Sequence, residues 1–168
     1  SSDLALQAQI NPHFLYNSLS IINWKAIEAG EDEISYVTLA LSTYYRTSLN
    51  RGETMTTVAK EIDNIRAYLK IQLVMHDNEF RVVEQISDGL NDYMIPKLIL
   101  QPLAENAIDH GIDVSDNEDP TLWLTIREEN EHIFFEIRDN GAGMTQEKAD
   151  QILTYQSSGY GVRNVCDR

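Results

Sequence analysis

The chain has 168 residues, one cysteine and a formal net charge of −14 at pH 7. This length suits one ordinary domain or two small ones, the single Cys166 excludes an internal disulfide, and no apolar run approaches the ~18 residues of a membrane span. Lys and Arg form no cluster, which disfavours nucleic-acid binding because phosphate contacts need clustered positive charge.

The first predicted element is a helix. Apolar residues recur at helical spacing from Leu4 to Ile27, and Gly30 stands where such a helix would end. Pro12 interrupts the run, because it removes one backbone hydrogen bond and clashes with the preceding turn. We therefore expect a kink or a new helix start at this proline, with Asn11 able to cap it.

Two more helices are predicted in the N-terminal half. Acidic residues at Asp32–Glu33 suit the positive end of a second helix, which Arg51–Gly52 closes. A third helix runs from about Val58 to His76, with Thr57 able to cap it.

The first two helices are too short to bury both of their apolar faces alone. We expect them to form a hairpin that dimerises into a four-helix bundle, with packing on the second half of the chain as the alternative. The residues expected at the dimer seam are Ile22, Ile34, Val37 and Leu41.

After Asp77–Asn78 the sequence predicts strands as well as helices. A strand is predicted over Phe80–Ile86, followed by a turn at Asp88–Asp92. A helix is predicted over Pro96–Gly111, with a break expected at Pro102.

The remaining elements begin with a hairpin. Alternating residues predict strands over Thr121–Glu128 and His132–Asp139, joined by Glu129–Glu131. Two helices follow, from Thr145 to about Leu153 and from Gly161 onward. The chain is thus predicted to be α+β, with a helical unit followed by a mixed unit.

The stretch LQPLAENAIDHG at Leu100–Gly111 presents polar groups on a predicted helix. Asn106 and His110 lie one turn apart on the same face. An Asn oxygen suits Mg²⁺, which prefers oxygen ligands and keeps several waters, and an imidazole can donate to a phosphate. An ordinary polar helix face is the alternative.

Two glycine-containing stretches complete this pattern. DNGAGM at Asp139–Met144 places a carboxylate at a strand end, where it can accept from an adenine amino group, and two glycines that permit close backbone approach. GYGV at Gly159–Val162 places glycines before a predicted helix, where free N–H groups attract an anion. Taken alone, each stretch is also compatible with an ordinary turn.

A fourth block, NPHFLYN at Asn11–Asn17, contains His13. A single His in a helical run more often has a structural role. Histidine side chains in general are nevertheless partly neutral, and therefore nucleophilic, at cell pH.

In this order, the four blocks resemble a sensor histidine kinase of the LytS/YesM type. This family belongs to the GHKL superfamily of ATPases shared with gyrase, the heat-shock chaperone ATPase and the mismatch-repair ATPase. The resemblance covers nearly the whole chain. It rests on QAQINPHFLYNSL at Gln7–Leu19, IRAYLKIQ at Ile65–Gln72, IPKLILQPLAENAIDHG at Ile95–Gly111, DNGAGM, and GYGVRNVCDR at Gly159–Arg168.

The resemblance implies three regions. Residues 1–56 would form the helical dimerisation and phospho-acceptor region, and residues 57–78 a connecting helix. Residues 79–168 would form an ATP-binding α/β sandwich of the Bergerat type, which stops before the last strands of its relatives.

The resemblance also implies residue roles. His13 would be phosphorylated, Asn106 would coordinate Mg²⁺ and Asp139 would bind adenine. The other residues expected at the nucleotide are His110, Gly141, Gly143, Met144, Gly159 and Gly161.

The implied function is ATP-dependent autophosphorylation on His13, followed by phosphotransfer to an Asp of a response regulator. The implied protein is a homodimer, anchored upstream in a bacterial membrane, with this chain in the cytoplasm. The alternatives are an ATP-binding or ATPase module of the same superfamily without phosphotransfer, and a nucleotide-binding scaffold without turnover.

Among the positions that depart from patterns known in relatives, three concern the chemistry. Hydrolytic members of the superfamily carry a Glu one turn before the metal-binding Asn, where this chain has Pro102. Asp109 replaces a frequent Lys. Phe14 stands where other kinase classes place an acid after the phosphorylated His, so the general base is not identified.

Overall fold

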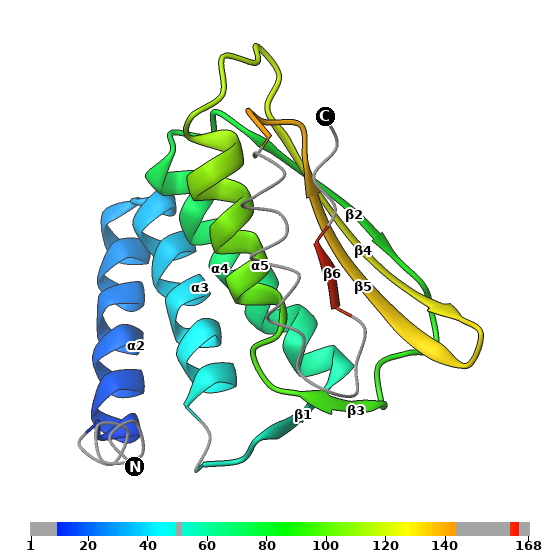
Figure 1. The fold of residues 1–168 in the computed structure, drawn as a ribbon. Helices are drawn as coiled ribbons and strands as arrows, with labels where there is room; N and C mark the ends of the chain where they lie inside the picture. Colours follow the sequence, from blue (N-terminus) through cyan, green and yellow to red (C-terminus); the bar gives the residue numbers. More distant parts are fainter. Residues whose placement is uncertain (1–9, 50–51, 144–161, 165–168) are drawn as a thin grey trace. The chain divides into compact units, whose positions relative to one another are not determined.

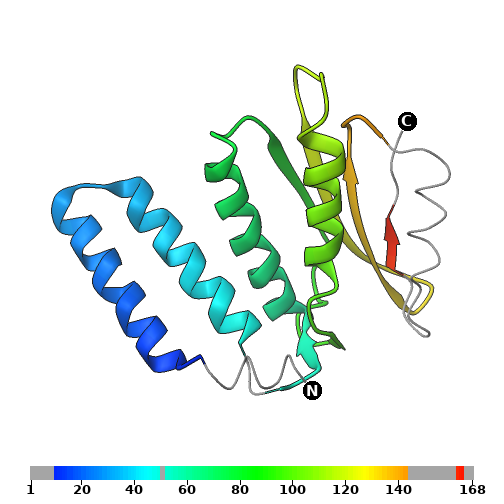
Figure 2. The same ribbon diagram turned by 60° about the vertical axis from the view of Figure 1, so that its left-hand side comes forward.

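The computed structural model describes residues 10–49, 52–143 and 162–164, and it divides into two compact units (Figures 1 and 2). The first, here called the helical unit, comprises residues 1–75 with 94–97. The second, the sheet unit, comprises residues 76–93 with 98–168. No helix in the described ranges is both long enough and apolar enough to cross a membrane.

The helical unit contains α2 (Pro12–Ala29), α3 (Asp32–Ser48) and α4 (Val58–Met75), which pack side by side in that order (Figure 2). The expected new start at Pro12 is confirmed, because the Asn11 side chain accepts a hydrogen bond from the Phe14 N–H at 3.2 Å. Gly30 ends α2 with a φ of 72°, a left-handed conformation that glycine adopts without strain.

The other helix ends of this unit also follow local rules. Thr57 caps α4, since its hydroxyl accepts from the Lys60 N–H at 3.2 Å. The α3 helix begins at the predicted acidic pair but ends at Ser48, earlier than the predicted close at Arg51–Gly52.

Two short strands in this unit differ from the sequence prediction. β1 (Met55–Thr57) pairs antiparallel with β3 (Met94–Pro96), with Thr56 opposite Ile95. The predicted helix start at Pro96 is therefore wrong. Three residues are too few to show a two-residue alternation, and the two partners lie far apart in sequence.

A partly buried polar cluster connects these strands to the end of α3. The Lys97 ammonium donates to the Ser48 carbonyl, where the negative end of the helix dipole favours a cation. Burial lowers the Lys97 pKa, and the carboxylates of Glu53 and Glu61 oppose that shift. Asn64, 1% exposed, donates to the hydroxyl of Ser48 at 2.8 Å.

The sheet unit is built on a four-stranded mixed sheet in the order β2-β4-β5-β6. β2 (Arg81–Ile86) runs parallel to β4 (Thr121–Glu129), which pairs antiparallel with β5 (His132–Asp139). β5 in turn runs parallel to β6 (Val162–Asn164). The predicted hairpin is confirmed, with Asn130 and Glu131 at φ values of 51° and 63° in its tight turn.

Helix α5 (Leu100–Ala107) continues into a π-helical turn, η1 (Ile108–Ile112), and lies against this sheet (Figure 1). Pro102 does not break α5, because in the first helical turn its missing N–H has no intrahelical partner. The core consists of one face of the β4–β5 pair and the inner face of the helix: Leu122, Leu124, Ile126, Phe135, Ile137, Leu100, Leu103, Ala104, Ala107 and Ile108.

The structure corrects one further prediction. The helix expected from Gly161 is absent at residues 162–164, which form strand β6. A strand edge carries unpaired backbone groups, and pairing with β5 satisfies them. The helix predicted over Thr145–Leu153 lies outside the described residues. The α+β class, a helical hairpin followed by a sheet with a helix on it, is confirmed.

Candidate functional site

The candidate site lies where the end of β5 meets the end of η1 in the sheet unit. Asp139 is the last residue of β5 and stands opposite Leu122. Strand alternation places it on the same face as Phe135 and Ile137, so a carboxylate continues a row of core side chains. Asp139 is 3% exposed, and acidic residues are rarely buried to this extent unless they are paired. Within residues 10–49, 52–143 and 162–164, it has no cationic partner.

Two glycines meet beside this carboxylate. A Cβ added to Gly141 would lie 2.2 Å from the carbonyl carbon and oxygen of Gly111, and one added to Gly111 would lie 2.3 Å from Oδ1 of Asp139. The Ala142 N–H donates to the Gly111 carbonyl at 3.1 Å, which joins the two segments. Only residues without side chains fit at this contact.

The π-helical turn brings Gly111 to this contact. The Asp113 N–H donates to the Ile108 carbonyl at 2.9 Å, one residue further along the chain than in an α-helix. Within the turn, Gly111 and Ile112 are buried, whereas His110 is exposed. Single π-helical turns inside helices frequently mark functional sites.

The two oxygens of the Asp139 carboxylate differ in their contacts with the described residues. Its Oδ1 accepts from the Gly141 N–H at 2.8 Å, whereas its Oδ2 accepts no hydrogen bond from the described residues. Burial raises the pKa of Asp139, and the hydrogen bond from Gly141 partly opposes this rise. The site therefore holds a poorly hydrated acceptor that can be satisfied by a hydrogen-bond donor from outside the chain.

The raised pKa predicts a pH dependence of stability. In the interval between the ordinary and the raised pKa, the folded chain binds more protons at Asp139 than the unfolded chain does. The free energy of unfolding of the wild type, relative to Asp139→Asn, should therefore fall as pH rises through the raised pKa. Urea unfolding of both proteins from acidic to neutral pH measures this difference in the free energy of unfolding. A stabilisation of the wild type, relative to Asp139→Asn, that grows with pH would contradict a raised pKa of Asp139.

The predicted site residues fall into three groups. Asp139, Gly141 and Gly143 lie at the end of β5, and the φ of 72° at Gly143 favours glycine. Asn106, half-buried, and His110 lie on the α5–η1 segment, with no hydrogen bond between them. His13 is exposed in the first turn of α2, in the helical unit. Three further residues lie outside the described ranges: Met144, Gly159 and Gly161.

Gly111 was not among the predicted site residues. It stands at the end of a predicted helix, where a glycine is common without a functional role. The available signal was its position directly after the Asn-containing helix, but its packing on Gly141 depends on a tertiary contact.

The chain is similar to known protein families and to a solved structure. The family described as histidine kinase matches residues 3–80, and the family of histidine kinase-, DNA gyrase B- and HSP90-like ATPases matches residues 91–166. A solved histidine kinase domain from the blue-light activated kinase of Erythrobacter litoralis EL346 aligns with 15% identity and a TM-score of 0.45, covering 87% of this chain and 70% of that chain.

Among curated relatives, sensor histidine kinase YesM of Bacillus subtilis is 36% identical over 83% of this chain and 24% of its own length. Sensor histidine kinase BtsS of Escherichia coli K12 is 36% identical over 84% of this chain and 25% of its own. Sensor protein LytS of Bacillus cereus is 30% identical over 98% of this chain and 28% of its own. The chain thus spans about a quarter of the length of these relatives. It belongs to the histidine kinase family and is similar to YesM and LytS.

Proposed function

We propose that the sheet unit binds ATP together with Mg²⁺, and that Asp139 recognises the adenine ring. The γ-phosphoryl group of this ATP would then be transferred to His13. The observation that carries this proposal is the buried Asp139 carboxylate, with Oδ2 available, beside the contact of Gly111 with Gly141. An adenine ring carries an exocyclic amino group that can donate to such an acceptor. The glycines let the ring lie close to the backbone.

The metal would be held mainly by the nucleotide. The described residues contain no group of three or more His, Cys, Asp or Glu that could bind a metal ion. Mg²⁺ binds through one or two protein oxygens together with phosphate oxygens and water, so the half-buried Asn106 is a suitable ligand. Mg²⁺ would supply neutralisation of phosphate charge, which a chain with a net charge of −14 requires.

The remaining residues proposed to contact the nucleotide come from η1 and from the glycine-containing stretches. His110 is exposed directly after the Asn-containing helix and would donate to a phosphate. Gly141, Gly143, Gly159 and Gly161 would shape the nucleotide pocket, and Met144 would be a further contact with the nucleotide. These residues would bind and orient the nucleotide without taking part in bond formation.

His13 is the proposed acceptor. It is exposed in the first turn of α2, so its ring is accessible to a phosphoryl donor. A ring nitrogen would attack the γ-phosphorus and form the N–P bond. The bond from that phosphorus to the bridging oxygen would break, and ADP would leave.

The whole protein is proposed to act as a homodimer that passes its phosphoryl group to an Asp of a response regulator. Its proposed location is the cytoplasmic side of a bacterial membrane, with an anchor upstream of this chain. Apolar side chains exposed on the described α2 and α3 support the dimer: Ile21, Ile22, Trp24, Ile27, Ile34 and Leu39. The other two residues of the predicted dimer seam, Val37 and Leu41, are half-buried.

The dimer has its own test. Replacing Ile22, 47% exposed, by Asp would place a charge on the proposed seam. Sedimentation should give a dimer mass for the wild type and a monomer mass for Ile22→Asp. Equal dimer masses for both proteins would place the seam elsewhere, and a monomeric wild type would contradict the dimer.

The nucleotide site is tested through its preference for adenine. Asp139→Asn should weaken ATP binding by about 1–3 kcal/mol. The Asn side-chain nitrogen is a donor and would face the adenine amino group, which donates to the carboxylate in the wild type. GTP presents a carbonyl at the corresponding ring position, so its affinity should change less. Calorimetry with both nucleotides and Mg²⁺ measures the ATP-to-GTP ratio, and an unchanged ratio in the variant would refute adenine recognition by Asp139.

A further inference from the structure

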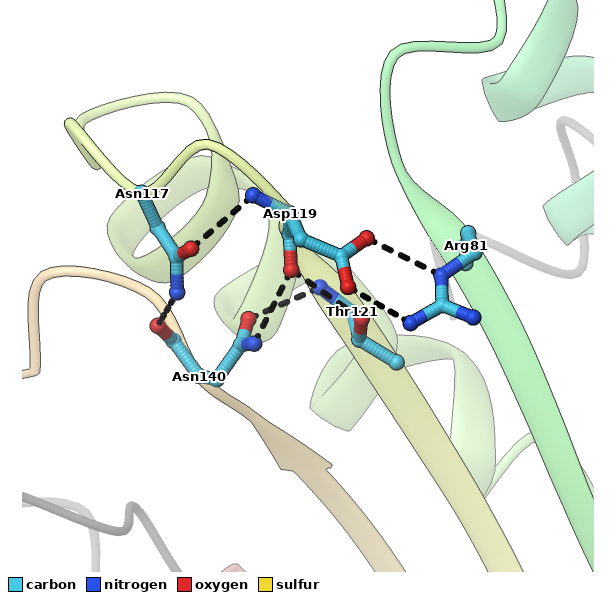
Figure 3. A network of polar contacts seen from close by, with 5 residues as sticks. All are labelled: Arg81, Asn117, Asp119, Thr121 and Asn140. Carbon is cyan, nitrogen blue, oxygen red and sulfur yellow. Dashed lines mark hydrogen bonds and ion pairs between the residues drawn. The ribbon is translucent and has the colours of Figure 1, made fainter.

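Each polar group of Asn140, between Asp139 and Gly141, has a hydrogen-bond partner. Figure 3 shows the contacts of its side chain and carbonyl. Its backbone N–H donates to the Thr121 carbonyl at 3.3 Å, and its side-chain oxygen accepts from the Thr121 N–H at 2.7 Å. Its side-chain nitrogen donates to the Asp119 carbonyl at 3.0 Å, and its own carbonyl accepts from the Asn117 side chain at 3.0 Å. The mechanism proposed above gives this residue no role.

The side chain of Asn140 replaces a backbone group in the sheet. The last ladder pair of β4 and β5 is Leu122 with Asp139. One residue further along, Thr121 still exchanges two hydrogen bonds with Asn140, but it donates to the side-chain oxygen rather than to the carbonyl. The Asn140 carbonyl is thereby free to turn toward Asn117. The backbone can therefore turn away from the sheet directly after Asp139, while the Thr121 N–H keeps a hydrogen-bond acceptor.

The partners of Asn140 are themselves fixed. The Arg81 guanidinium binds both carboxylate oxygens of Asp119, at 3.0 and 2.7 Å. The Asp119 N–H donates to the side-chain oxygen of Asn117 at 2.9 Å. These contacts join the starts of β2 and β4 to the end of β5 (Figure 3). The direction of the chain after Asp139 is therefore set by side chains from three segments.

We infer that Asn140 is a positioning residue for nucleotide recognition: it fixes where the chain leaves β5, and with it the Asp139 carboxylate and the contact of Gly141 with Gly111. This inference rests on the proposed function of Asp139. Asn suits the position because one short side chain supplies both an acceptor and a donor. Asp keeps the acceptor but loses the donor to the Asp119 carbonyl, and Ala loses both.

The test is a double-mutant cycle on ATP affinity in the presence of Mg²⁺. Asn140→Ala should weaken ATP binding about tenfold or more and remove the preference for ATP over GTP, with Asn140→Asp intermediate. Added to Asp139→Asn, Asn140→Ala should cause little further loss, because both changes remove the same interaction. Asn91→Ala, at an exposed turn of the sheet unit, is the matched control and should leave affinity unchanged.

A readout without nucleotide separates positioning from general destabilisation. In Asn140→Ala, the amide hydrogens of Gly141 and Ala142 should exchange faster, because their acceptors on Asp139 and Gly111 are no longer held in place. The amides in the middle of β4 should keep their protection. Loss of protection throughout the sheet, or an unchanged ATP-to-GTP ratio in folded Asn140→Ala, would overturn the inference.

A milder variant covers the case in which Asn140→Ala does not fold. Asn117→Ala removes the hydrogen bond to the Asn140 carbonyl and should weaken ATP binding a few-fold in the same direction. Unchanged affinity in Asn117→Ala would then refute the inference. Failure of the proposed function is distinguishable, because in that case Asp139→Asn itself would leave the ATP-to-GTP ratio unchanged.

Discussion

Replacing Gly141 by Ala is expected to destabilise the sheet unit by roughly 3 kcal/mol, a large effect for adding one methyl group. The new Cβ would lie 2.2 Å from the carbonyl carbon and oxygen of Gly111 and 2.6 Å from its Cα. These are backbone atoms, which cannot rotate out of the way as a side chain does. The two segments would have to separate, which would break the hydrogen bond from Ala142 to Gly111 and expose Asp139.

Gly89→Ala is the matched control for this prediction. Gly89 has a φ of 80° but no atom within 4 Å of an added Cβ, so its substitution introduces backbone strain without a clash. The expected loss is about 1–2 kcal/mol. Urea unfolding of the three proteins measures both effects. Equal stability losses in Gly141→Ala and Gly89→Ala would contradict the close contact between Gly141 and Gly111.

Replacing His13 by Gln is expected to abolish transfer of the γ-phosphoryl group to the protein. The residue is exposed in α2, so its substitution should leave folding and ATP affinity unchanged. A neutral imidazole attacks without losing a proton, whereas an amide is not a nucleophile. Labelling with γ-phosphate-labelled ATP should fall at least ~100-fold, in the range that removal of a covalent nucleophile produces.

His132→Gln provides the control for labelling. His132 is exposed at the start of β5, in the hairpin, and its substitution should leave labelling unchanged. Label retained in His13→Gln but lost in His132→Gln would move the acceptor to the hairpin. Label retained in both would place it on another residue.

Water is not expected to compete as the acceptor. Pro102 occupies the position one turn before Asn106 and carries no acid or base. Glu105 is exposed, about 100° around the helix from Asn106, and accepts from the Gln101 side chain at 3.0 Å. No carboxylate on α5 is therefore placed to activate water beside the proposed metal ligand.

The sequence predicted those elements whose signals are local. Asn11 with Pro12, Gly30 and Thr57 mark helix ends through their own backbone and side-chain chemistry, and each appears at the predicted place. The β4–β5 hairpin follows from strict alternation. Asp139 and its glycines could be singled out because a strand end, a carboxylate and two glycines are adjacent in sequence.

The remaining features depend on contacts between distant segments. β1 and β3 are three residues each and gain their hydrogen bonds only from one another. The π-helical turn has no sequence signature, and it decides that Gly111 faces Asp139. β6 shows that the glycines before it precede a strand rather than the predicted helix. Such features require the tertiary fold.

The most direct test of the central claim is the chemical nature of the product formed with Mg²⁺ and γ-phosphate-labelled ATP. We expect label on the wild-type protein that is lost in acid, retained in base and absent from His13→Gln, because these are the properties of an N–P bond to imidazole. Steady multiple-turnover release of free phosphate, unchanged in His13→Gln and without label on the protein, would contradict the kinase assignment and make the chain an ATPase.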